Sequence, residues 1–144
     1  MKNKKVIGRR EQISLPELHL FNIDAKVDTG AYTSAIHCHD IKIFTKNDEK
    51  WVRFKLLDPT HSQYNHQEIA LPVVKLKKIR SSSGHTQKRV IIKTKMILYD
   101  REYVAEFSLA DRTDMIYPIL LGRKAISGKF IVDVSKFNLS ITPK

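Results

Sequence analysis

Cysteine, acidic residues and long apolar runs are all scarce in this chain. Cys38 is its only cysteine, so no disulfide can form within the chain. That scarcity fits a reducing compartment, and we expect a cytoplasmic protein. No apolar run approaches the ~20 residues of a membrane-spanning helix, and no apolar segment follows the basic residues 1–5 as it would in a signal peptide. We therefore expect no membrane partner.

The shortage of acidic residues leaves a strong positive charge. Lys and Arg number 26 against 15 Asp and Glu, a net charge of +11 at pH 7. Such a charge attracts nucleic acid, acidic peptides or a membrane surface, or it is simply a solvated basic surface. No helix-turn-helix, zinc-finger or RNP-type motif is present, so we do not expect nucleic acid as the partner. The densest basic cluster comprises Lys75, Lys77, Lys78, Arg80, Lys88, Arg89, Lys93 and Lys95.

Short segments of alternating apolar and polar residues, separated by turn residues, predict an all-β fold. The expected strands cover residues 12–15, 18–27, 33–37, 41–43, 51–57, 68–77, 90–99, 102–109 and 115–121, and alternation recurs at 130–134 and 137–141. Residues 123–127 are the one helical turn that we expect. A chain of 144 residues, 42% of them hydrophobic, suits one domain that spans residues 1–144.

The main chemical signal is Asp28-Thr29-Gly30, which directly follows alternating apolar residues at 23–27. The carboxylate would lie where a buried strand opens into a turn. Thr29 can hydrogen-bond inside that turn, and Gly30 lets a substrate or a second chain come close. Taken by itself, the motif is equally typical of a structural turn whose Asp accepts backbone N–H groups.

Aspartic peptidases need two carboxylates that share a proton, so that one acts as an acid while the other acts as a base toward water. This chain contains one Asp-Thr-Gly. A second Asp28 from another copy would complete the pair, because a two-fold axis places the same residue on both of its sides. Peptidase chemistry would therefore require a homodimer.

Three motifs in order carry a family resemblance: Lys26-Val-Asp-Thr-Gly-Ala-Tyr-Thr-Ser-Ala-Ile-His37, Arg80-Ser-Ser-Ser-Gly84 and Pro118-Ile-Leu-Leu-Gly-Arg-Lys-Ala125. Over about residues 8–134 the chain resembles the retropepsin-like family known as ATP-dependent zinc proteases, which is often linked to RimK-type ATP-grasp glutamate ligases. The resemblance implies a pepsin-like barrel, closed or partly open, in a homodimeric peptidase. The sequence shows no Walker A, His-Glu-x-x-His or Cys-x-x-Cys pattern, so we expect no cofactor and no metal.

The resemblance also implies roles for single residues. Asp28 would be the catalytic aspartate, and Thr29, Gly30 and Ala31 would complete its loop. Leu121, Gly122 and Arg123 would pack beside that loop. Ser81, Ser82, Ser83, Gly84 and His85 would form the tip of a flap, although the same residues are also typical of an ordinary exposed hairpin.

Two positions near the motif need separate comment. The family loop usually has Arg where this chain has Tyr32, whose hydroxyl can still donate one hydrogen bond. Arg123 has two possible roles, a buried ion pair within the chain or a pair across the dimer interface. Its partner would lie near Asp28 or in the loop that holds Asp111 and Asp114.

His37-Cys38-His39 raises two further alternatives. On a strand, His37 and His39 point to the same side, and imidazoles suit zinc or copper. A zinc site usually needs a third protein ligand, however, and no spacing selects one. Cys38 as a nucleophile would need a histidine beside it in space, whereas its neighbours on a strand face the opposite way. We expect a polar strand end and a small buried residue instead.

These observations predict a retropepsin-type aspartic endopeptidase, a homodimer that hydrolyses peptide bonds with a water activated by paired Asp28 residues. The positive charge and the implied link to glutamate ligases predict acidic substrates, including glutamate-modified peptides. One alternative is a non-catalytic module that binds a RimK-type ligase or another acidic partner. Another is a basic barrel that binds nucleic acid.

Overall fold

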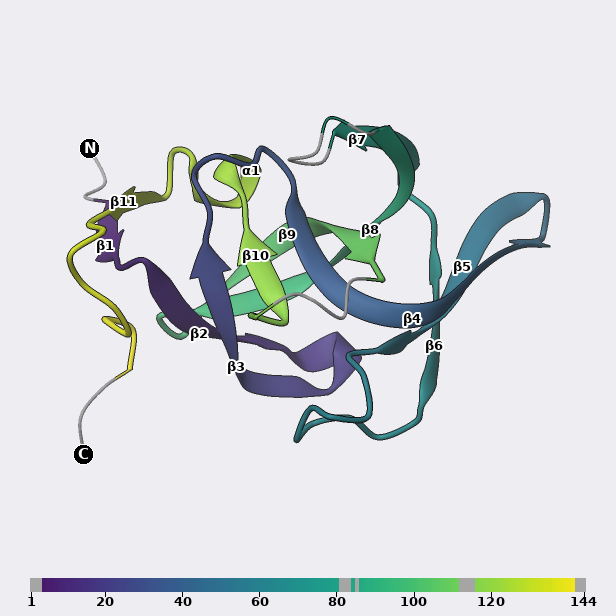
Figure 1. Ribbon diagram of the computed structural model, residues 1–144, viewed down its shortest axis with the longest axis horizontal. Helices are drawn as coiled ribbons and strands as arrows, with labels where there is room; N and C mark the ends of the chain where they lie inside the picture. The colour runs from purple at the N-terminus through teal and green to yellow at the C-terminus, as the bar shows by residue number, and fades with distance from the viewer. Residues whose placement is uncertain (1–3, 81–83, 85, 112–115, 142–144) are drawn as a thin grey trace.

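The computed structural model describes residues 4–80, 84, 86–111 and 116–141, and most of them lie in strands (Figure 1). The strands are β1 (Lys5–Ile7), β2 (Arg10–Leu15), β3 (Leu20–Val27), β4 (Ser34–Lys46), β5 (Glu49–Leu56), β6 (Glu68–Pro72), β7 (Lys75–Arg80), β8 (Thr86–Leu98), β9 (Arg101–Ala110), β10 (Ile119–Leu121) and β11 (Phe130–Val132). A 3-10 turn, η1 (Pro16–Leu18), and a short helix, α1 (Arg123–Ile126), complete the elements. The predicted all-β fold and the helical turn at 123–127 are confirmed. Neither helical element has the length or apolar character to cross a membrane, within the residues described.

Strand β10 closes the sheet into a barrel, because it pairs with two neighbours at once. It runs parallel to β3, with Leu121 beside Val27, and antiparallel to β4, with Ile119 beside Ile36. The ring then continues through β3, β2, β8, β9 and β4. The predicted pepsin-like closed or partly open barrel is thus confirmed. Figure 1 shows β10 lying between β3 and the start of β4.

The buried apolar side chains form one cluster, which includes residues of the ring and of β5, the strand that pairs with β4 outside the ring. Strand β5 illustrates how the sequence dictates this arrangement. Val52 and Phe54 are fully buried, whereas Arg53 faces solvent, as the period of two along a strand requires. Each fully buried side chain of this size contributes about 1.5–3 kcal/mol to folding.

The segment at residues 68–77, predicted as one strand, is in fact two. Strand β6 pairs with β5, and β7 pairs with β8. Between them the backbone N–H of Val73 binds the carbonyl of Lys50 in β5, and that of Val74 binds the carbonyl of Ile91 in β8. The chain therefore crosses from one sheet edge to another just after Pro72, which has no N–H to extend a ladder.

The first half of the chain also differs from the prediction at β4. The segments at 33–37 and 41–43, predicted as separate strands, lie in one strand that begins at Ser34 and has a register shift between His39 and Lys42. Asp40 lies at this bulge with a φ of 54°, a left-handed conformation that Asp tolerates better than most residues. The bulge bends β4, so that its first half belongs to the barrel and its second half pairs with β5 outside it.

The C-terminal segment is held by a buried carboxylate. Residues 137–141, whose alternation predicted a strand, form none. Glu11 in β2 is fully buried, and its two oxygens accept the backbone N–H groups of Gly8, Leu139 and Ser140 and the Ser140 hydroxyl, at 2.6–3.0 Å. Gly8 fits there because a Cβ would lie only 2.3 Å from the Lys136 carbonyl oxygen. One carboxylate thus joins the two ends of the chain.

We expect Glu11→Ala to destabilise the fold by about 3 kcal/mol, because it leaves one buried and two part-buried N–H groups without an acceptor. Urea denaturation followed by circular dichroism measures the change. Glu102→Ala, on the exposed side of β9, is the matched control and should change stability by less than about 0.5 kcal/mol. Equal stability of the two variants would contradict the anchoring role.

Candidate active site

Asp28 lies where the buried strand β3 ends and a turn begins. Its backbone N–H binds the Leu121 carbonyl in β10 at 2.9 Å, and its own carbonyl accepts the Ala31 N–H at 3.2 Å. Within the turn, the Gly30 N–H donates to Asp28 Oδ1 at 3.0 Å. Oδ2 accepts no hydrogen bond from the described residues, and the side chain is only partly buried. One carboxylate oxygen is therefore fixed and the other is available to a ligand.

Gly122 allows two backbone segments to cross directly beneath this turn. A Cβ at Gly122 would lie 2.7 Å from the Tyr32 carbonyl oxygen and 2.8 Å from the Thr33 carbonyl carbon. The buried Ser34 hydroxyl accepts the Gly122 N–H at 3.0 Å. On the far side of the crossing, the N–H groups of Arg123 and Lys124 bind the carbonyls of Ala31 and Tyr32 at 2.8 and 3.0 Å. Leu121, Gly122 and Arg123 therefore back the Asp28 turn on one side.

The Arg123 side chain is exposed and holds the same turn from outside. Its guanidinium donates to the Thr29 carbonyl at 3.0 Å. The buried ion pair considered from the sequence is therefore wrong for this residue, and the described contact falls in the neighbourhood of Asp28. Asp114 lies outside the described residues.

Tyr32 links the Asp28 turn to the β7–β8 hairpin. Its ring, 50% exposed, lies 4.7 Å from the Lys77 ammonium and 5.8 Å from the Arg123 guanidinium. Lys77 in β7 also donates to the Thr33 hydroxyl at 2.7 Å. The hairpin expected to form the flap is thus in contact with the turn. Its tip, Ser81, Ser82, Ser83 and His85, lies outside the described residues, and Gly84 is exposed with a φ of 89°.

A second layer of charge lies beside Tyr32. Glu106 in β9 accepts a hydrogen bond from Lys124 at 2.8 Å and lies 3.8 Å from the Lys75 ammonium. The hydrogen bond from Lys124 is the main reason that the pKa of Glu106 is lowered, and the same contact raises the pKa of Lys124. These lysines are therefore already partly neutralised, whereas Lys77 and Arg123 form no ion pair with any described carboxylate.

His37 and His39 are both engaged in structural contacts. His37 is buried, with Nε2 2.8 Å from Asp58 Oδ2 and Nδ1 3.3 Å from the Ala110 carbonyl. His39 Nδ1 lies 2.8 Å from the Leu57 carbonyl. Among the described residues, no cluster of three or more His, Cys, Asp or Glu side chains could hold a metal ion. The histidines instead fasten the segment that follows β5.

Asp58, the partner of His37, is held as a carboxylate. Hydrogen bonds from the hydroxyl and backbone N–H of Thr60 lower its pKa to about 2, and His37 contributes less. Cys38 is fully buried, and burial raises the pKa of its thiol to about 12. A thiol in that state is a poor nucleophile, so the expectation of a small buried residue is confirmed.

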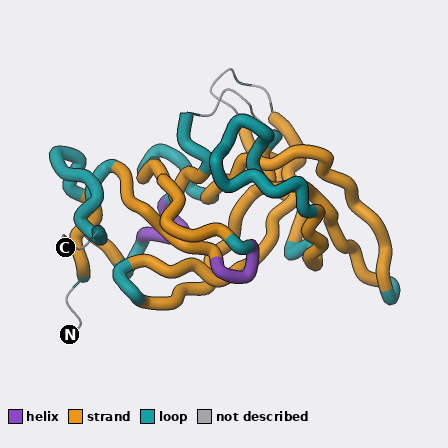
Figure 2. The backbone as a smooth tube through the Cα atoms, turned by 90° about the horizontal axis from the view of Figure 1, so that it is seen from below, coloured by secondary structure: helices purple, strands orange, loops and turns teal. Residues whose placement is uncertain are grey.

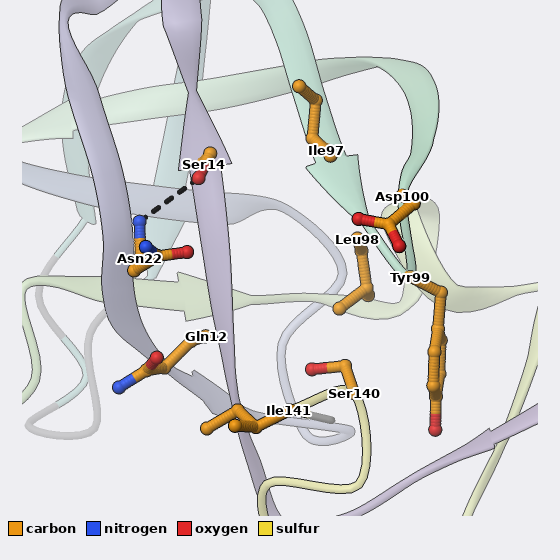
Figure 3. Close-up of a pocket in the computed structure, with 9 residues that line it drawn as sticks. All are labelled: Gln12, Ser14, Asn22, Ile97, Leu98, Tyr99, Asp100, Ser140 and Ile141. Carbon is orange, nitrogen blue, oxygen red and sulfur yellow. Dashed lines mark hydrogen bonds between the residues drawn. The ribbon is translucent and has the colours of Figure 1, made fainter. Parts of the chain in front are cut away.

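A separate pocket of about 320 Å³ lies elsewhere on the barrel (Figure 3). It is formed by β2, β3, the end of β8 and the C-terminal segment. Its walls consist of Gln12, Ser14, Asn22, Ile97, Leu98, Tyr99, Asp100, Ser140 and Ile141. None of these residues belongs to the Asp28 turn, and the pocket has one carboxylate, Asp100, where an acid–base pair would need two. It carries no evident chemistry.

Sequence reasoning missed two residues of the candidate site. Lys77 appeared only as part of a basic cluster, although it contacts both Tyr32 and Thr33. Ser34 was not singled out, although its hydroxyl fixes Gly122. The spacing of Ser34 from Asp28 offered a weak signal, whereas nothing local to Lys77 indicates a contact with residues 44 positions away.

Comparisons with known proteins agree with this geometry. A family model described as the RimB-like "Retropepsin-like aspartic endopeptidase RimB" matches residues 6–143. A crystal structure of a protein of unknown function from Legionella pneumophila superimposes with a TM-score of 0.76 at 24% sequence identity, covering 96% of this chain and 100% of that one. That likeness shows that the two chains share a fold.

Curated relatives are longer proteins. A probable alpha-L-glutamate ligase of Shewanella pealeana is 38% identical over 138 residues, which are 93% of this chain and 29% of the relative. A probable alpha-L-glutamate ligase of Parasynechococcus marenigrum is 34% identical over 137 residues, 92% of this chain and 28% of the relative. The chain thus spans less than a third of the length of these relatives. Because the family model accounts for nearly every residue of the barrel, the chain belongs to the RimB-like family of retropepsin-like aspartic endopeptidases.

Proposed function

We propose that this chain is an aspartic endopeptidase that acts as a homodimer. The observation that carries the proposal is the state of Asp28. Its turn is fixed by β10 and Gly30, one carboxylate oxygen is held, and the other is open to a ligand. By contrast, the buried Glu11, whose role is structural, uses both of its oxygens as acceptors.

The chemistry requires the Asp28 residues of two copies to share one proton and one water. The ionised carboxyl takes a proton from the water as its oxygen attacks the peptide carbonyl carbon, and the protonated carboxyl gives its proton to the carbonyl oxygen. Collapse of the tetrahedral intermediate then breaks the C–N bond, and a proton passes to the leaving amine. Thr29 and Gly30 are exposed at the turn, where a second copy can approach.

The surroundings of the site favour an acidic substrate. Family loops usually carry Arg at the position of Tyr32, and here Lys77 and Arg123 place two cations against the Tyr32 ring. Both cations lack a described carboxylate partner, so a glutamate side chain of a substrate would supply one. The β7–β8 hairpin would act as the flap, because Lys77 already ties it to Thr33.

A second candidate function rests on the names of the relatives. Segments that match this chain form 28–29% of proteins named probable alpha-L-glutamate ligases. In that reading, the barrel binds a RimK-type ligase or another acidic partner without cleaving it. A barrel that stays monomeric would favour this function, because the two Asp28 residues would never meet.

We expect wild-type protein to cleave peptides from a library that includes glutamate-tailed sequences, assayed from pH 4 to 8, and Asp28→Asn to lose at least 100-fold in kcat/KM. The loss follows because an amide can neither take nor give the proton. Asp24→Asn, on the exposed side of β3, is the matched control and should retain activity. No cleavage by a folded wild-type dimer would shift the assignment to the binding function.

A second prediction concerns specificity. Lys77→Gln should lower kcat/KM for glutamate-rich peptides about two- to five-fold, the scale of one exposed ion pair, and leave neutral peptides nearly unchanged. Added salt should reduce the difference by screening it. Lys78→Gln, one residue along β7 and therefore on its other face, is the control. Cleavage that is indifferent both to acidic residues and to salt would rule out the acidic preference.

A further inference from the structure

The second half of β4 leaves the barrel and forms an arm with β5 and β6. The hairpin of β4 and β5 extends away from both chain ends in two perpendicular views (Figures 1 and 2). Along β5, buried positions alternate with positions on the outer face of the arm. Val52 and Phe54 are fully buried, and their neighbours point outward. This arm has no part in the proposed peptidase chemistry.

Two aromatic rings occupy the middle of the outer face. Phe44 of β4 lies directly opposite Trp51 of β5, and their ring centroids are 6.4 Å apart. On the other side of Trp51 lies Pro72 of β6, and the position beside it on that strand's outer face is Ala70. Phe44 and Trp51 are themselves half-buried. The Trp51 Nε1–H finds no acceptor within the described part of the chain.

Three cations flank this aromatic pair, together with Glu49 of β5, which lies opposite Lys46 in the register. Lys46 lies 4.5 Å from the Trp51 ring, and the Arg53 guanidinium lies 5.8 Å from the Phe44 ring. Lys42 lies opposite Arg53 in the register of β4 and β5. All three are exposed, and none forms an ion pair with a described carboxylate. By contrast, Lys55, which lies on β5 as Arg53 does, has its ammonium 3.7 Å from the Asp40 carboxylate.

We infer that the outer face of the arm binds single-stranded nucleic acid. Bases would stack on Phe44 and Trp51, and Lys42, Lys46 and Arg53 would contact the phosphates. Aromatic side chains interleaved with cations on a small sheet bind single strands in this way, without base-specific motifs. The absence of such motifs in the sequence therefore does not exclude this ligand. This surface supports the nucleic-acid alternative, and the sequence alone could not reveal it.

The aromatic pair distinguishes this ligand from an acidic peptide. An acidic peptide would need only the cations, and these would serve equally well without rings beside them. Each ring has an exposed cation beside its face, and a base could take the place of that cation, because every base offers a flat face for stacking. In this site the rings would bind the bases and the cations would bind the phosphates.

Trp51 makes a direct experiment possible, because it is the only tryptophan of the chain. Intact protein is titrated with oligouridylate and oligothymidylate of about 12 nucleotides, within the length that one small β platform covers. We expect saturable quenching of the tryptophan fluorescence. The logarithm of the association constant should fall with the logarithm of salt concentration with a slope of roughly −2, from three phosphate contacts.

Variants then test each component. Phe44→Leu keeps an apolar residue on β4 but removes a ring, and should weaken binding roughly five-fold or more. Lys42→Gln and Arg53→Gln should each make the salt slope shallower by about 0.7. Lys129→Gln is the matched control, since Lys129 also lies over an aromatic ring, 5.9 Å from that of Tyr103, but outside the arm. Thermal unfolding verifies that each variant is folded.

Several outcomes would overturn the inference. These are no saturable quenching, equal affinity for a duplex of the same length, and equal affinity for a glutamate oligomer of matched charge. The last result would identify an acidic protein surface as the ligand. Asp28→Asn should bind the oligonucleotides as tightly as wild type, so failure of the peptidase proposal and failure of this one remain distinguishable.

Discussion

At Gly122 two backbone segments pass so close that no side chain fits between them. The crossing lets β10 lie between β3 and β4 and pair with both, and that double pairing closes the barrel. It also determines where Asp28 lies, because the N–H of Asp28 binds the Leu121 carbonyl one residue before the crossing. The same crossing therefore closes the barrel and places the Asp28 carboxylate. A turn held this way by backbone contacts keeps its carboxylate in place without needing side-chain partners for both oxygens.

The net charge of +11 is distributed unevenly, and its distribution matters more than its size. Beside the Asp28 turn, Glu106 offsets Lys75 and Lys124, which leaves Lys77 and Arg123 around Tyr32. On the arm, Lys42, Lys46 and Arg53 form no ion pair with a described carboxylate, although Glu49 lies opposite Lys46 in the register. Exposed charges separated by more than about 8–10 Å are largely screened at physiological salt. The two groups of cations lie on different elements of the fold, one beside the Asp28 turn and one on the arm, and the two proposals assign a different ligand to each.

The sequence predicted what depends on neighbouring residues and failed where distant segments decide. The inward and outward alternation of β5, the helical turn after Gly122 and the Asp-Thr-Gly turn are local features, and all three are present. The division of residues 68–77 depends on Val73 and Val74 bonding to different strands, which no local pattern encodes. Glu11 accepts a hydrogen bond from the Ser140 hydroxyl, 129 positions away in the sequence. Within the site, Lys77 reaches Thr33 only because the hairpin folds back over the turn.

Because each chain has one Asp28, the proposed activity would require two chains to associate. The dyad would exist only at a two-fold axis, so the active fraction depends on chain concentration by mass action. Below the dissociation constant of the dimer, each barrel would retain its Tyr32 surface and its arm but could not cleave. The same fold would then act as a binding module when dilute and as a peptidase when paired. In the relatives, the matching segment makes up 28–29% of a longer chain, and any contact that paired two such chains would raise the fraction of paired barrels. Under these proposals the two candidate functions would be two states of one association equilibrium, and the free energy of pairing would set their balance.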